Sequence, residues 1–145
     1  MTNRALCLDL IRELPKGDPE GYRETVARLD EAGWEELALV VGAAFFLAAR
    51  RKVGVNAGKD AVIGFVADMR AAMSSTGFDL DPIVAERLIA STMDQGSDEL
   101  DDVSGDTVIE TQLFLLTGLL SGLSEGEMAE FLARVDALVE EWATA

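Results

Sequence analysis

The sequence predicts an all-α fold, a compact bundle of six or seven helices around a buried central helix at about residues 34–52. No segment shows the sustained alternation of apolar and polar residues that a half-buried strand needs. Apolar residues instead recur at intervals of three and four, and helix start and stop signals punctuate the chain. The chain has 145 residues, 49% of them apolar, which is enough for a single helical domain over residues 1–145.

The first two helices follow from their caps and apolar faces. Asn3 is a suitable N-cap for a first helix, which residues 15–17 end. Asp18 followed by Pro19 is a strong start signal for a second helix, and Gly33 is its natural stop. The apolar positions of these two helices are spaced for one buried face each: Leu6, Leu10, Ile11 and Leu14, then Tyr22, Val26 and Leu29.

The third helix, residues 34–52, is apolar on nearly every side, which predicts burial at the centre of the bundle. Its uncharged run, residues 37–49, spans thirteen residues. A bilayer span needs about 20, so no membrane helix is expected. Glu35 and Glu36 precede the run and three basic residues end it, as the helix dipole favours.

Start signals also mark the later helices. A fourth helix begins near Asn56 or Gly58, and Asp81 followed by Pro82 opens a fifth. The expected inner residues are Val62, Phe65, Val66, Met69 and Met73 on the fourth, and Ile83, Val84, Leu88 and Ile89 on the fifth.

Two capping boxes predict the last two helices. Thr107 and Glu110 open the sixth, which runs to Gly122, and Ser124 and Glu127 open the seventh. The apolar stripe of the seventh is Met128, Phe131, Leu132, Val135, Leu138, Val139 and Trp142.

Charge is distributed very unevenly along the chain. Residues 1–70 hold ten basic and eleven acidic groups, whereas residues 71–145 hold two basic and sixteen acidic groups, a net charge of −1 against −14. Such a field repels nucleic acids and anionic lipids and favours a basic protein partner. The sequence therefore predicts a non-enzymatic, acidic protein–protein interaction module that docks a basic partner through its C-terminal half.

The densest carboxylate cluster is the candidate partner-binding site. It lies in and beside the acidic loop at residues 94–105 and comprises Asp94, Asp98, Glu99, Asp101, Asp102 and Asp106. Two plainer interpretations stay open. The acidic surface keeps the protein in solution, or it is compensated within the molecule by the basic cluster Arg50, Arg51, Lys52 and Lys59.

The composition excludes much catalytic chemistry. The chain has no histidine, so it offers no histidine base and no histidine metal ligand. Cys7, the single cysteine, is expected to be a buried thiol among leucines. No catalytic residue, cofactor site or metal site is therefore assigned. The alternative is a small enzyme or sensor with a carboxylate site for Mg²⁺ or Ca²⁺ in the acidic loop or at Glu127 and Glu130, which share one helix face.

Two further expectations concern assembly and location. The sixth helix is apolar on more than one face, and either the central helix or a second copy of the chain is needed to cover it. A homodimer through residues 107–142, as a structural subunit of a homo-oligomer, is therefore another alternative. The N-terminal residues have no apolar core typical of a signal peptide, so a cytoplasmic location is expected.

Overall fold

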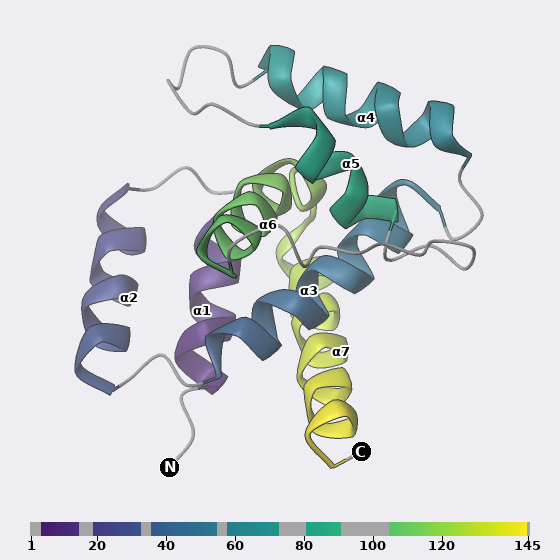
Figure 1. Cartoon of the computed structure of the whole chain (residues 1–145). Coiled ribbons are helices and arrows are strands. Elements are labelled where there is room, and N and C mark those ends of the chain that lie inside the picture. The colour runs from purple at the N-terminus through teal and green to yellow at the C-terminus, as the bar shows by residue number, and fades with distance from the viewer. Residues whose placement is uncertain are drawn as a thin grey trace.

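The computed structural model describes residues 4–14, 19–32, 36–54, 58–72, 81–90 and 105–144, and these ranges hold helices and no strand (Figure 1). The all-α class predicted from periodicity is thus confirmed. The helices are α1 (Arg4–Glu13), α2 (Pro19–Ala32), α3 (Leu37–Lys52), α4 (Lys59–Ala72), α5 (Pro82–Ala90), α6 (Gly105–Leu119) and α7 (Glu125–Thr144).

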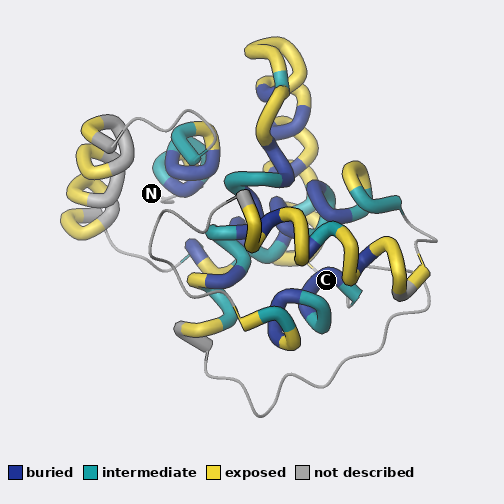
Figure 2. Tube along the Cα trace, turned by 90° about the horizontal axis from the view of Figure 1, so that it is seen from above, coloured by how far each residue is buried: buried dark blue, intermediate teal, exposed yellow. Residues whose placement is uncertain are grey.

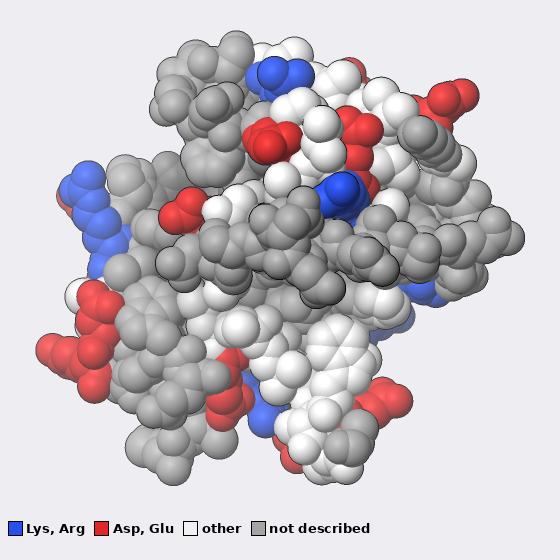
Figure 3. Space-filling view, in the orientation of Figure 1, with Lys and Arg blue, Asp and Glu red and all other residues white. Residues whose placement is uncertain are grey.

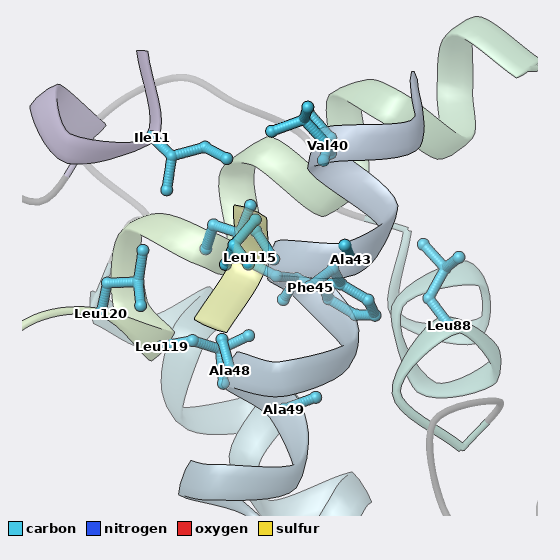
Figure 4. Close-up of a cluster of buried hydrophobic side chains, with 14 of the residues drawn as sticks. Ile11, Val40, Ala43, Phe45, Ala48, Ala49, Leu88, Leu115, Leu119 and Leu120 are labelled. Carbon is cyan, nitrogen blue, oxygen red and sulfur yellow. The ribbon is translucent and has the colours of Figure 1, made fainter. Parts of the chain in front are cut away.

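Helices α1 and α3 to α7 contribute described buried side chains to one hydrophobic cluster. Figure 4 shows this cluster where α1, α3, α5 and α6 meet, with Ile11, Phe45, Leu88 and Leu115 among its members. Helix α3 packs against α1, α6 and α7, α5 packs against α6, and α4 packs against α5. Helix α2 lies against α1 at the edge of the molecule (Figure 1).

Helix α3 covers the whole apolar run at residues 37–49 and ends at Lys52, as the sequence predicts. Its buried residues are Leu37, Val40, Val41, Ala43, Ala44, Phe45, Ala48 and Ala49. One edge is more open, since Ala38 is exposed and Gly42 and Phe46 are half-buried. The start expected at residue 34 lies outside the described residues. The central position of α3 in the bundle stays a prediction.

Two predicted helix starts are confirmed by their hydrogen bonds. Helix α5 begins at Pro82, and the Asp81 carboxylate accepts a hydrogen bond from the Ile83 N–H at 2.9 Å. At the start of α7, the Ser124 hydroxyl accepts from the Glu127 N–H, and the Glu127 carboxylate accepts from the Ser124 N–H, both at 3.1 Å. This reciprocal pair is a capping box, and it satisfies donors that the first turn leaves unpaired.

Two local predictions are wrong. Helix α6 begins at Gly105, so Thr107 lies inside the first turn and does not open the helix. Ile83 is 64% exposed, although it was expected on the inner face of α5. The buried face of α5 is set by Val84, Ala85, Leu88 and Ile89. Since each residue turns the helix by about 100°, Ile83 lies on the side opposite to that face.

Other expectations fall on residues that the structure does not describe. These are the cap at Asn3, the end of the first helix at residues 15–17, the start at Asp18, the stop at Gly33, the start at Asn56 and the inner residue Met73. The burial of the expected inner residues of α2, Tyr22, Val26 and Leu29, is not described either. Among the described helices, none is both long enough and apolar enough to cross a bilayer.

Candidate functional site

The acidic loop that forms most of the predicted partner-binding site lies outside the described residues. This applies to Asp94, Asp98, Glu99, Asp101 and Asp102. Asp106 lies in the first turn of α6, where only its backbone is described. Within the described ranges, no three carboxylate or cysteine side chains are grouped so that they could hold one metal ion.

The acidic charge that the structure does describe is concentrated on α7. This helix carries six carboxylates and one arginine, a net charge of −5. Five apolar side chains form its buried face: Met128, Phe131, Leu132, Val135 and Val139. Every charged residue of α7 is exposed, because the apolar stripe fixes which side turns inward. The charged residues are Glu125, Glu127, Glu130, Arg134, Asp136, Glu140 and Glu141.

Arg4 joins the N-terminal helix to α7 through three carboxylates. Its Nε donates to Glu36 at 3.1 Å, and its Nη1 donates to Asp136 at 3.2 Å and to Glu140 at 2.6 Å. Only 18% of the Arg4 side chain is exposed. The hydrogen bonds to Glu140, Glu36 and Asp136 raise the pKa of Arg4 above its ordinary value. Arg4 therefore holds α1, the start of α3 and the outer side of α7 together.

No spacing rule predicts the Arg4 cluster, because its members are separated by up to 136 positions. One local signal was present. A basic residue in the first turn of a helix opposes the helix dipole, and Arg4 is the first residue of α1. A cation in that position is favourable only when tertiary contacts offset the local cost.

Glu127 is engaged on both of its oxygens. Oε1 accepts the Ser124 N–H, and Oε2 lies 3.3 Å from Nη2 of Arg51 at the end of α3. The hydrogen bonds from Ser124, helped by the charge of Arg51, lower the pKa of Glu127. Both oxygens of Glu127 are thus engaged within the chain, and the metal site considered at Glu127 and Glu130 stays a prediction.

The charge of α7 is therefore compensated in part within the molecule. Glu127, Asp136 and Glu140 contact arginines of the N-terminal half. Glu125, Glu130 and Glu141 have no ion-pair partner among the described residues. On the face shown in Figure 3, the described acidic and basic side chains are interspersed with uncharged ones.

Trp142, near the end of α7, packs on α3 and stays 38% exposed. Its ring meets Phe46 edge to face, with centroids 6.0 Å apart, and the Arg50 guanidinium lies 4.9 Å from the Phe46 centroid. A Cβ at Gly42 would lie 4.0 Å from the Trp142 ring, an ordinary contact distance. An exposed tryptophan beside acidic residues provides an apolar contact point on the acidic side of the molecule.

A hollow of about 440 Å³ lies where α1 faces the start of α7. It is lined by Arg12, Leu120, Gly122, Leu123, Ser124, Glu125 and Met128. Arg12 is 45% exposed and lies 3.5 Å from Asp9 on its own helix. The lining of the hollow is thus mostly uncharged, with one basic residue, Arg12, and one acidic residue, Glu125.

Cys7 is fully buried in α1, as expected. Burial, with a smaller effect of the Glu36 charge, raises the pKa of its thiol to about 11. The thiol is thus protonated at neutral pH, whereas a cysteine nucleophile reacts as the thiolate. Cys7 acts as a small apolar side chain.

The apolar surface of α6 is covered by neighbouring helices of the same chain. Leu115, Leu116, Leu119 and Leu120 are buried, and α3 and α5 pack against α6. The sequence analysis left two ways to bury the apolar surface of this helix, against the same chain or against a second copy. The structure shows burial against the same chain. The homodimer through residues 107–142 stays a prediction, without an uncovered apolar face on α6 to support it.

Comparison with known proteins gave no relatives. No protein-family model matches the chain, and no curated protein or solved structure matches it either.

Proposed function

We propose that the protein is a non-enzymatic interaction module that docks a basic protein partner through its acidic C-terminal half. The observation that carries the proposal is the unpaired charge on α7. Glu125, Glu130 and Glu141 are exposed and have no ion-pair partner among the described residues. The other three carboxylates of this helix already contact arginines.

The spacing of these carboxylates indicates what the partner should present. Glu130 and Glu141 are eleven residues apart, so they lie within about 20° on one side of α7 and about 16 Å apart along it. Trp142 follows Glu141 and is partly exposed. Tryptophans are enriched among the residues that dominate binding energy at interfaces. A partner surface with two positive charges about 16 Å apart, and an apolar contact beside one of them, would fit this side of α7.

The acidic loop belongs to the same proposal. Asp94, Asp98, Glu99, Asp101 and Asp102, with Asp106, add negative charge to the C-terminal half. Their long-range field would speed association with a cationic partner and orient it, while α7 supplies the described contact face. Affinity for the partner should therefore fall steeply as salt screens the charges.

Affinity capture with the immobilised full chain tests the proposal. We expect basic proteins to be retained and released by sodium chloride. Glu130→Gln with Glu141→Gln should reduce the yield, while the matched pair Glu20→Gln and Glu31→Gln, which removes the same charge from exposed positions of α2, should not. The proposal would be contradicted if acidic proteins were retained, or if the yield did not change with salt. An equal loss of yield in the two double variants would also contradict it.

The carboxylate–metal alternative is separated from this proposal by calorimetry. Titration with Mg²⁺, Mn²⁺ and Ca²⁺ should give no saturable heat and no change in melting temperature at millimolar metal if the acidic residues serve docking alone. Saturable heat that is lost on replacing the carboxylates of residues 94–106 would favour the alternative.

We also infer that α3 is the central helix of the bundle. Three helices far apart in sequence, α1, α6 and α7, pack against it. Half of its sixteen residues are buried. The open edge at Ala38 and Phe46 is the side on which Trp142 packs. A helix in this position organises the interaction face on α7 without contributing to it directly.

A further inference from the structure

We propose that a second copy of the chain docks on the outward face of α4, with the two helices antiparallel. Helix α4 lies at one edge of the molecule, beyond α5 (Figure 1), and packs mainly against α5. Val62, Val66 and Met69 form its buried side. The opposite side is exposed along the length of the helix, at the front of Figure 2.

The outward face is composed mostly of small and apolar residues. Its exposed members are Asp60, Ala61, Ile63, Gly64, Ala67, Asp68, Arg70 and Ala71. Ile63 is 40% exposed and is one of three large apolar side chains exposed in the described part of the chain. A second, Ile83, is on the neighbouring helix α5. Apart from Trp142, the large apolar side chains that are exposed among the described residues thus lie on α4 and α5.

Gly64 is the residue that the single chain does not explain. It lies in the middle of a fourteen-residue helix, where glycine is the least favourable residue apart from proline. A Cβ built at Gly64 would have no atom within 4 Å, and the backbone there has no positive φ. Close approach of another backbone is a standard reason for glycine in such a position. Within the described residues, nothing makes that approach.

The charges of α4 identify a second copy as the occupant. Asp60 lies in the first turn and Arg70 in the last. In an antiparallel pair related by a two-fold axis, Asp60 of each copy faces Arg70 of the other. The midpoint of that pairing falls at residue 65, beside Gly64, so the helices are closest where the side chain is absent. An isologous interface needs this kind of self-complementarity.

Net charge also favours this face over the rest of the molecule. The whole chain carries −15, which opposes self-association. The two acidic and two basic residues of α4 cancel, as do Glu86 and Arg87 of α5. By contrast, α7 carries −5. Two copies that meet through α4 therefore keep their most acidic helices out of the contact.

The dimer should be weak and should be strengthened by salt. Helix α4 is about 21 Å long, and one pair of such helices buries less than the roughly 1,600 Å² of a standard interface. Sodium chloride screens the repulsion between two chains of charge −15. This salt dependence is opposite in sign to that expected for docking of a basic partner, so the two interactions are distinguishable.

The mass of the full chain, measured by sedimentation at protein concentrations from about 5 to about 500 µM, tests the proposal. These concentrations cover the dissociation constants expected for a small interface. We expect the mass to move from 15.6 kDa towards twice that value, more readily at higher salt. Gly64→Gln should raise the dissociation constant at least about tenfold while leaving the melting temperature equal or higher, because glutamine is a better helix former. A mass of 15.6 kDa at every concentration would overturn the proposal.

Two further variant sets test the geometry. Ala133→Gln, which places the same glutamine side chain on the exposed side of α7, should leave the dimer intact. A dimer that survives Gly64→Gln but not Ala133→Gln would move the interface to α7 and overturn the assignment to α4. Asp60→Arg and Arg70→Asp should each weaken the dimer, and the double variant should restore it. A double variant no better than the single ones would exclude the antiparallel pairing.

Discussion

Helices α3 and α7 pack against each other but differ in burial and in charge. Eight of sixteen residues of α3 are buried, and its only charges are the three cations of its last turn. Five of twenty residues of α7 are buried, and its outer side carries six carboxylates and one arginine. We therefore expect fold stability to depend mainly on α3, and the docking proposed above to depend mainly on the outside of α7. Substitutions on the two helices should therefore change different measured quantities.

The largest expected effect is that of Val41→Asp in α3. Val41 is completely buried, and an unpaired buried carboxyl group costs several kcal/mol. Since domains of this kind are stable by only about 5–15 kcal/mol, we expect loss of the cooperative thermal transition, followed by circular dichroism. Ala38→Asp, at an exposed position of the same helix, is the matched control and should melt cooperatively. An unchanged melting temperature for Val41→Asp would mean that α3 is not central.

The next effect compares two adjacent residues of α7. Phe131→Ala removes a side chain that is 6% exposed and should lower the free energy of unfolding by about 3–5 kcal/mol. Glu130→Ala, one position earlier on the exposed side, should change it by no more than about 0.5 kcal/mol. Urea denaturation measures both. Similar losses for the two variants would show that the outer side of α7 also contributes to the core.

A smaller effect concerns the capping box. Ser124→Ala should lower the free energy of unfolding by about 1 kcal/mol at pH 7. Ser121→Ala, at a serine that caps no helix start, should lower it by less.

The folded protein lowers the pKa of Glu127 from its ordinary value of 4.5. The stability due to this shift is therefore present above pH 4.5 and is lost as the pH falls through the lowered pKa. The difference between wild type and Ser124→Ala should shrink as the pH is lowered below 4.5, measured by thermal melts across pH. A difference independent of pH would mean that the Glu127 charge does not contribute.

The smallest effect is that of salt on the monomer. Because Glu125, Glu130 and Glu141 lack partners among the described residues, we expect sodium chloride up to a few hundred millimolar to raise the melting temperature by about 2–3 °C. Glu130→Gln with Glu141→Gln should reduce this rise in scanning calorimetry at low protein concentration. A melting temperature that falls with salt would show that the pairs made by Arg4 and Arg51 dominate.

Local rules predicted the features that depend on neighbouring residues. The Asp81 start, the Ser124–Glu127 capping box and the burial of Cys7 follow from short-range spacing or side-chain type, and the structure confirms them. The inner residues of α7 follow from periodicity for the same reason. Ile83 was misassigned because it was grouped with its apolar neighbours by residue type, although the turn of about 100° per residue places it opposite the face of Val84, Leu88 and Ile89.

The candidate site was less predictable because it depends on packing between distant helices. Arg4 meets Asp136 and Glu140, and Arg51 meets Glu127, across separations of 76 to 136 residues. Charge counts showed that the two halves of the chain differ, but not which carboxylates the N-terminal arginines neutralise. The orientation of α7 against α1 and α3 decides which of its carboxylates are left unpaired.

The contacts of Arg4 also constrain the order of folding. Arg4 is synthesised before two of its partners, Asp136 and Glu140, which follow 132 and 136 positions later. Contacts of such high sequence separation form slowly, because the loop-closure entropy is lost before they are gained. During synthesis, at about 5–20 residues per second, α1 can pack against α2 and α3 well before α7 is made. The hydrogen bonds of Arg4 to Asp136 and Glu140 form only when α7 docks.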